Sequence, residues 1–457
     1  MRYFINTIKI IALICGLLFL TLVIVNWGDE ELKPEVVQAL AWKPPTNAFA
    51  DNGYLILLGI KAPIEMNASQ VGKKALEAEL ARFATAQKTH IELPAPKQNP
   101  AEVDDYIDWK DNQCNYQMQP NCVDFYLQQD ADKLNFALLA EDRLAKRFQA
   151  IKQSKNYVEV MPPLISAEFP KYTLLMQASE MERVQVILDI SEGKLEQGVA
   201  RFAENAAFSR RLLRESNSLI SHMVALALMQ RDTRVLSELM LKYPIIVTKY
   251  AAQLVPVLAP ISTPEYNLKK VFIYEKNLGL TTINIANNLA ESEATAAGLD
   301  YFLQLLRVGY LKVFYQPNAT LNLLCDWSQY RIKLTEVSAA ELDQAKQDLQ
   351  HNQQTLLGLG IHPYYIKNPM GKILASVADP DYAMYIERKY DLDGYIYMVN
   401  SQLVAILNKL EINKSDLHDP YKNLMQYDAN SGVLTFAGRQ PSSGNFNKSN
   451  IYQVKLH

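Results

Sequence analysis

The sequence predicts a mainly α protein with three parts: an N-terminal transmembrane helix, a body of helical hairpins that could stack as a solenoid, and a small C-terminal β-hairpin. Three observations predict this fold class. An apolar run of membrane-spanning length stands near the N-terminus. Apolar residues then recur at helical spacing through most of the chain, and after about residue 410 their period changes from 3.6 to 2.

The apolar run predicts a membrane anchor over residues 9–27. From Ile10 to Val25 nearly every residue is apolar or small. A run of about 20 such residues is long enough to cross a bilayer core of ~30 Å as a helix. Basic residues precede the run and acidic residues follow it, so we expect residues 1–8 to be cytoplasmic. The main domain would then lie in the periplasm, on a single-pass protein of the cell inner membrane.

Two alternatives to a retained anchor are a cleaved signal peptide and a lipoprotein leader. A signal peptide needs small residues in A-x-A spacing soon after its apolar core. The nearest match, Ala39-Leu40-Ala41, stands well beyond Val25. A lipoprotein leader needs its cysteine at the end of the core, whereas Cys15 lies in the middle of it. We therefore expect the segment to remain attached.

Composition indicates a globular protein with a substantial core. Of the 457 residues, 49% are hydrophobic and 21% are charged, which is typical of a folded domain. The formal net charge is only −3, and no block of Lys or Arg suggests a surface for nucleic acid. We therefore expect no nucleic-acid partner.

The four cysteines indicate one disulfide. Cys114 and Cys122 are close in the chain, and in an oxidising compartment they would pair with each other. The alternative is two unpaired thiols. Cys325 has apolar neighbours and is interpreted as a small buried side chain.

The body is expected to follow a linker and to be helical. Residues 28–53, with prolines and an Asp-Asn-Gly turn, predict a juxtamembrane linker, and residues 54–411 predict a mainly helical extracytoplasmic domain. Residues 69–87 have helical spacing, while the type of the apolar segment 54–60 is left undecided.

Two stretches of the body have apolar stripes that predict how their helices pack. Between residues 123 and 151 one apolar stripe runs through the segment, and Phe136 and Leu139 widen it, which predicts a helix packed on more than one side. Two further stripes meet at Gly193 and resemble one unit of a tetratricopeptide-type hairpin. No second copy follows at the period of that repeat, so a generic antiparallel helix pair is preferred.

The last part of the chain, residues 412–457, predicts a β-hairpin tail. Strand-like runs flank the turn-forming segment 428–432. An isolated hairpin is marginally stable, so we expect a third strand from residues 54–60 or 451–456. The tail should pack on the helical body through four apolar residues, which are Leu424, Tyr427, Leu434 and Phe436.

The sequence predicts no catalytic, cofactor-binding or metal-binding residue, and no cofactor. Ser191 and Lys194 match S-x-x-K, but they stand at a turn between helices and no partner motif accompanies them. Asp391, Asp393 and Gly394 resemble a fragment of a calcium loop. A complete loop needs further ligands and a glycine at its sixth position, so a helix beginning at Asp393 or Gly394 is preferred.

Two segments carry a resemblance over most of the chain. Together with the anchor and the helical body, "NPMGKIL" (368–374) and "DPYKNLMQYDANSGVLTFAG" (419–438) resemble a group of uncharacterised Gram-negative single-pass membrane-anchored proteins. The resemblance implies this architecture and no known activity.

Two functional hypotheses follow. The first is an envelope interaction or scaffold protein that binds another protein or peptide. The second is a cell-envelope hydrolase whose two carboxylates come from distant helices. The first is preferred, and whether the chain is an enzyme is left open. A deep pocket with two facing carboxylates would favour the hydrolase, and a shallow apolar groove would favour the binding protein.

Overall fold

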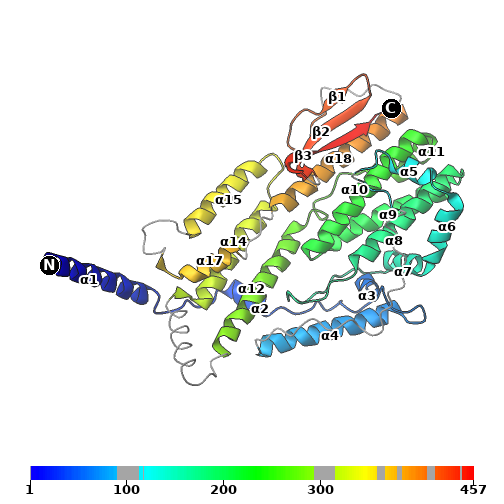
Figure 1. The fold of residues 1–457 in the computed structure, drawn as a ribbon. Coiled ribbons are helices and arrows are strands. Elements are labelled where there is room, and N and C mark those ends of the chain that lie inside the picture. Colours follow the sequence, from blue (N-terminus) through cyan, green and yellow to red (C-terminus); the bar gives the residue numbers. More distant parts are fainter. Residues whose placement is uncertain are drawn as a thin grey trace.

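The structure is a computed structural model that describes residues 2–89, 113–116, 118–292, 314–357, 366–377, 383–408, 417–442 and 445–456. It is mainly helical, with an apolar N-terminal helix that projects from the body and a small sheet near the C-terminus (Figure 1). The predicted fold class is confirmed.

The described elements have the following bounds. The helices are α1 Arg2–Val25, α2 Pro34–Leu40, α3 Gly53–Leu58, α4 Ala68–Thr89, α5 Cys122–Leu127, α6 Ala131–Ala140, α7 Asp142–Gln153, α8 Tyr172–Ser191, α9 Leu195–Glu215, α10 Leu219–Lys242, α11 Ile245–Leu254, α12 Leu268–Ser292, α14 Pro317–Leu334, α15 Leu342–Leu357, α17 Pro369–Val377 and α18 Ala383–Asn408. The strands are β1 Gln426–Asp428, β2 Val433–Ser442 and β3 Asn445–Lys455.

Helix α1 is long and apolar enough to cross a membrane over Phe4–Val25. Its apolar side chains are exposed, because it makes no core with the body. These properties fit an anchor and also a signal segment.

The residues that follow α1 are bonded to the body. The Asn26 side chain donates to the Ile366 carbonyl oxygen at 2.9 Å and accepts from the Asn368 N–H at 2.7 Å. The Asp29 carboxylate accepts from the N–H groups of Asn318 and Ala319, where α14 begins. Four N–H groups at a helix start lack partners within the helix, so Asp29 acts as a cap for α14.

The segment expected to be a linker contains α2, and α2 is packed. Val36 and Ala39 are buried in an apolar cluster with Leu280 of α12 and Leu321 of α14. The chain between α1 and the body is therefore fixed by contacts on both sides of residue 33. The Lys33 ammonium adds an ion pair with Asp326 at 2.6 Å.

The stripe expected between residues 123 and 151 is divided into α5, α6 and α7. Asp130 marks the boundary between α5 and α6. Its side chain accepts from the N–H groups of Asp132 and Lys133 and so caps the start of α6. The expectation that Phe136 and Leu139 pack on a second side is wrong. Their side chains are 71% and 74% exposed.

The hairpin of α8 and α9 forms as expected at Gly193. This residue has φ of +82°, a conformation that glycine adopts without a steric penalty. The N–H of Lys194 then donates to the carbonyl oxygen of Asp189 at 2.8 Å and closes the turn. Helix α10 packs against both α8 and α9, and α18 packs against α10. The main apolar core lies between these helices and the sheet.

Helix α18 overturns both interpretations of the segment 391–394. The helix runs through these residues without a break, so neither Asp393 nor Gly394 begins a helix and no calcium loop is formed. Across the described part of the chain, no group of three or more His, Cys, Asp or Glu residues could hold a metal ion. The reason for the uninterrupted helix is tertiary packing, since α18 is buried between α10 and the sheet.

The tail forms a three-stranded antiparallel sheet in the order β1-β2-β3, which lies on α18 (Figure 1). Residues 451–455 belong to the third strand, whereas most of the segment 54–60 is helix α3. Leu434 and Phe436 are buried as expected, and Tyr427 is half-buried. Leu424 is exposed, so its expected role in packing is wrong.

Asp391 holds the sheet on α18. One oxygen of its buried carboxylate accepts from the Tyr421 hydroxyl at 2.7 Å and from the Arg439 N–H at 3.1 Å. Close approach is possible because Gly394 has no side chain. A Cβ at that position would stand 2.8 Å from the Phe436 ring.

We predict that Asp391→Ala lowers the free energy of unfolding by about 2–3 kcal/mol, because the Tyr421 hydroxyl then keeps only a long bond to the Glu387 carbonyl oxygen at 3.4 Å, and the Arg439 N–H loses this acceptor. Asp428→Ala is the control, since that carboxylate caps an exposed turn and should matter by less than about 1 kcal/mol. Thermal unfolding of the full chain compares the two. Equal melting temperatures for both variants would contradict this role of Asp391.

Candidate binding groove

Two glycines bring α3 and α4 into backbone contact. A Cβ at Gly72 would stand 1.8 Å from the Leu55 carbonyl oxygen, and one at Gly59 would stand 2.0 Å from the Ala68 carbonyl oxygen. No other residue fits at either position. This close crossing fixes the start of α4 and the intervening loop 60–67 beside α7.

Arg147 of α7 holds that loop in place. Its buried guanidinium donates to the carbonyl oxygens of Ile60, at 2.6 Å, and Pro63, at 2.9 Å. The loop then turns outward, and the side chains of Ile64 and Met66 are 64% and 47% exposed. A single exposed apolar side chain is normal on a protein surface, but two neighbouring ones form an apolar patch of the kind found at binding sites.

An open groove of about 330 Å³ is lined by the loop 60–67, α3, the start of α4 and α7. Its apolar lining includes Ile56, Ile64 and Met66. Its charged lining consists of Arg143, Lys146 and Arg147 of α7, and no carboxylate lines it. We call this hollow the basic groove. Figure 1 shows α3 and α7 on the side of the body away from α1.

Helical spacing explains why the basic residues gather on one wall. Arg143, Lys146, Arg147 and Ala150 are separated by three, one and three residues, which places them on one face of α7. Lys146 also pairs with Asp142 at 2.5 Å, and both of these side chains are largely exposed. An exposed pair contributes little to stability, so it can exchange partners easily.

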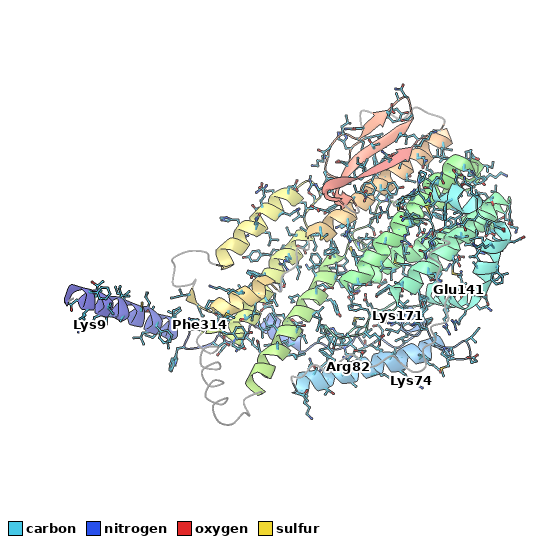
Figure 2. The ribbon with its side chains drawn as sticks, in the orientation of Figure 1. Lys9, Lys74, Arg82, Glu141, Lys171 and Phe314 are labelled. Atoms are coloured by element: carbon cyan, nitrogen blue, oxygen red, sulfur yellow. A yellow bond between two sulfur atoms is a disulfide. The ribbon has the colours of Figure 1, made fainter. Side chains whose placement is uncertain are left out.

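Further apolar surface lies on the neighbouring helix. Helix α6 contacts α7 and carries the exposed Phe136 and Leu139. Figure 2 shows Glu141, the residue between α6 and α7, at the end of the body opposite Lys9 of α1. This end of the molecule therefore exposes four large apolar side chains on α6 and the loop 60–67.

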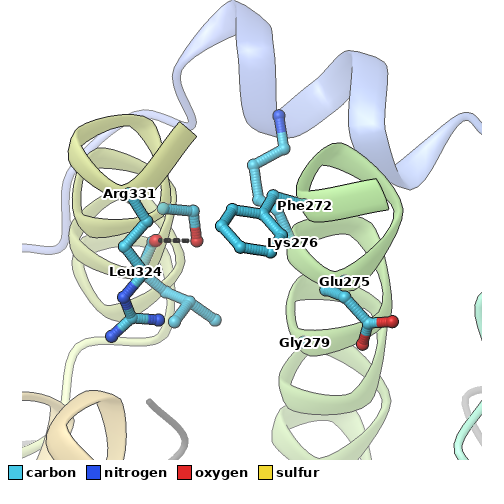
Figure 3. A pocket seen from close by; sticks show the side chains of 7 residues that line it. Phe272, Glu275, Lys276, Gly279, Leu324 and Arg331 are labelled. Carbon is cyan, nitrogen blue, oxygen red and sulfur yellow. Dashed lines mark hydrogen bonds between the residues drawn. The ribbon is translucent and has the colours of Figure 1, made fainter. Parts of the chain in front are cut away.

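A second cavity lies between α12 and α14 and holds about 20 Å³, room for roughly one water molecule. Phe272 and Leu324 face the gap (Figure 3). Glu275 is the single carboxylate of this lining, and it points away from α14 (Figure 3). Neither of the two cavities thus offers the pair of carboxylates that the hydrolase hypothesis requires.

Serine, histidine and glutamate side chains meet at the start of α10, but they are closed off from solvent. Glu159 accepts from the hydroxyls of Ser218 and Ser221 at 2.6 and 2.5 Å. Ser216 is hydrogen-bonded to His222 Nδ1 at 2.8 Å, and all of these residues are buried. A catalytic triad would require a group that orients the second ring nitrogen of His222, and that atom has no partner.

His222 should make stability depend on pH. Burial, together with the nearby charge of Lys389, lowers the pKa of His222 to about 3. In the unfolded chain the pKa of histidine is about 6.5, so below that pH only the unfolded state binds a proton. We therefore predict that stability is complete above pH 6.5 and has fallen by about 2 kcal/mol at pH 5.

The measurement is thermal unfolding of wild type and His222→Gln between pH 7.5 and pH 5. Other groups titrate in both proteins, so the quantity of interest is the difference between the two curves. Wild type should lose more stability than the variant. Parallel curves would show that His222 does not set this dependence.

A buried ionic cluster joins α8 to α10. The guanidinium of Arg183 is fully buried and pairs with Glu180 at 2.8 Å and Asp232 at 2.6 Å. Burial acts to raise the pKa of Glu180, but Arg183 and the Tyr126 hydroxyl outweigh it, and the pKa is lowered. These pairs link α8 to α10, and removal of one partner would leave an uncompensated buried charge. They leave no position for a substrate.

The sequence-derived candidates lie apart from the basic groove. Cys114 and Cys122 form a disulfide at the start of α5. Ser191 donates to a carbonyl oxygen of its own helix, and Lys194 pairs with Glu192. Cys325 is buried in the cluster around α2.

The basic groove was not predicted from the sequence. The signals that could have indicated it are the spacing of the cations on α7 and the exposed apolar pair in the loop 60–67. Their meeting depends on the glycine crossing of α3 and α4, which involves residues 55–72, while the cations come from residues 143–147.

Comparison with known proteins gives no family for this chain: no family model, no curated protein and no solved structure matches it.

Proposed function

We propose that the chain is a single-pass protein of the Gram-negative inner membrane whose periplasmic body binds another protein or peptide. The observation that carries this proposal is the basic groove, which is open, partly apolar and lined by cations without a carboxylate. Binding sites for peptides commonly combine an apolar floor with a few polar groups that set orientation.

Retention of the anchor is supported by the contacts that follow α1. Cleavage near residue 28 would remove Asn26 and its two hydrogen bonds to the segment before α17. Cleavage near residue 42 would also remove α2, and with it Val36 and Ala39 from the core. Cleavage by a signal peptidase at either position would therefore remove residues that form contacts with the folded body.

The periplasmic location is supported by charge and by the disulfide. Arg2 and Lys9 precede the apolar run of α1 and acidic residues follow the helix, which favours a cytoplasmic N-terminus. The bonded Cys114 and Cys122 suit an oxidising compartment. Mass determination of a C-terminally tagged protein from the membrane fraction tests retention. A soluble product that begins near residue 28 or 42 would contradict it.

The binding proposal is tested by photocrosslinking in intact cells. A photoreactive amino acid at Met66, at the edge of the groove, should form a covalent product with a second protein, which mass spectrometry identifies. Arg143→Gln with Lys146→Gln should reduce this product, because both cations leave the groove wall.

The control position is Val404 of α18, which is similarly exposed but lies outside the groove. A product at Met66 that does not form at Val404 supports the proposal. The same product at both positions, or none at Met66, would contradict it.

A further inference from the structure

The basic groove combines two features that together select one kind of peptide. The loop 60–67 supplies apolar surface through Ile64 and Met66, and α7 supplies positive charge through Arg143 and Lys146. The whole chain has a formal net charge of −3, so this charge is not a general property of the protein.

We infer that the groove recognises an acidic peptide segment in which carboxylate side chains flank an apolar side chain. This inference rests on the proposed function and names the chemistry of the partner. The apolar side chain lies on Ile64 and Met66, and the carboxylates pair with Arg143 and Lys146. Opposite charges in such a pairing favour the correct partner and exclude basic segments.

The three cations of the groove have different tasks. Arg147 is buried and bonded to the carbonyl oxygens of Ile60 and Pro63, so it builds the groove wall. Lys146 is exposed, and its partner Asp142 is also exposed, so a peptide carboxylate can replace that partner. Arg143 can bind a carboxylate with two parallel N–H donors.

The start of α4 adds positive electrostatic potential to the groove. Ala68 and Ser69, the first residues of this helix, line the groove. The N-terminal end of a helix carries partial positive charge and favours a nearby anion. Asn67 caps the helix by accepting from the Gln70 N–H at 3.1 Å. The helix end thus reinforces a preference that the side chains of α7 establish.

The experiment is fluorescence anisotropy with the full-length chain in phosphatidylcholine nanodiscs. The probes are three short labelled peptides with the repeats Glu-Leu-Glu, Gln-Leu-Gln and Lys-Leu-Lys. The Glu peptide should bind most tightly and should weaken as salt is added, because screening reduces the attraction between exposed charges. Arg143→Gln with Lys146→Gln should weaken its binding by about tenfold.

Matched variants show whether the groove itself is responsible. Lys88→Gln with Lys249→Gln removes the same charge from exposed positions outside the groove and should leave the affinity unchanged. Met66→Gln keeps the charge and should weaken all peptides that bind through the apolar surface. Circular dichroism establishes that every variant has the wild-type helical content.

The outcomes separate the inference from the proposed function. Equal affinity for the Glu and Gln peptides, or a preference for the Lys peptide, would overturn the acidic preference while leaving a peptide-binding groove. No binding of any peptide, with the Met66 crosslink still formed in cells, would also overturn the inference alone. Loss of both signals would overturn the inference and the proposed function together.

Discussion

Gly72→Ala is expected to destabilise the protein by at least about 3 kcal/mol and to abolish binding at the basic groove. The added Cβ would stand 1.8 Å from the Leu55 carbonyl oxygen, which belongs to a backbone that cannot move without separating α3 from α4. Separation would displace the loop 60–67 from Arg147. Thermal unfolding and peptide anisotropy on the same preparation measure both effects.

Gly279→Ala is the matched control for this substitution. It lies within α12, where an added Cβ would stand 3.4 Å from the Leu324 side chain, an ordinary contact distance. Alanine in a helix interior should stabilise by about 0.5–1 kcal/mol. If Gly72→Ala melted at the wild-type temperature and bound peptide normally, the glycine crossing would not position the groove.

Arg183→Met should have the second large effect, a loss of about 3–5 kcal/mol in the free energy of unfolding. The change removes the cation that lies between Glu180 and Asp232 and leaves two buried carboxylates without it. Urea or thermal unfolding measures the loss. Adding Glu180→Gln and Asp232→Asn to the variant should restore part of the stability, because no buried charge then needs the guanidinium.

Arg231→Met is the control for Arg183. Arg231 approaches the same carboxylate of Glu180, but at 3.6 Å and from a partly exposed position. Solvent weakens such a pair, so its removal should matter by less than about 1 kcal/mol. Equal losses from the two arginine variants would contradict the central role assigned to Arg183.

The features that could be predicted from the sequence are those set by local pattern. The apolar run of α1, the turn at Gly193 and the change of period in the tail each depend on residues close together in the chain. The buried positions of Leu434 and Phe436 followed from alternation along one strand. These patterns are reliable because a helix or a strand places side chains on its buried face at a fixed spacing in the sequence.

Other features depend on contacts between distant segments. Asp393 and Gly394 resemble the start of a helix in isolation, yet packing against the sheet keeps α18 continuous through them. One apolar stripe crosses α5 to α7, although Asp130 caps a new helix within it. The period of the apolar residues predicts a helix, but it does not indicate which of these side chains pack against another element. Phe136 shows the difference, because it widens the apolar stripe in the sequence and yet is exposed in the structure.

The basic groove could not have been predicted for the same reason. It forms where the loop 60–67 meets α7. The contact between Ile60 and Arg147 joins residues that are 87 positions apart in the chain. No local pattern records that contact. The glycines that permit it are visible in the sequence, but their partners are carbonyl oxygens of Leu55 and Ala68, which any residue could supply.

Hydrogen–deuterium exchange with the Glu-Leu-Glu peptide is the most direct test of the claim that the basic groove is the binding site. The full-length chain in nanodiscs is compared with and without peptide. We predict that exchange slows at residues 60–70 and at the start of α7, and that it is unchanged in Arg143→Gln with Lys146→Gln. Slower exchange between α12 and α14 instead, or no change in residues 60–70 at saturating peptide, would contradict this claim.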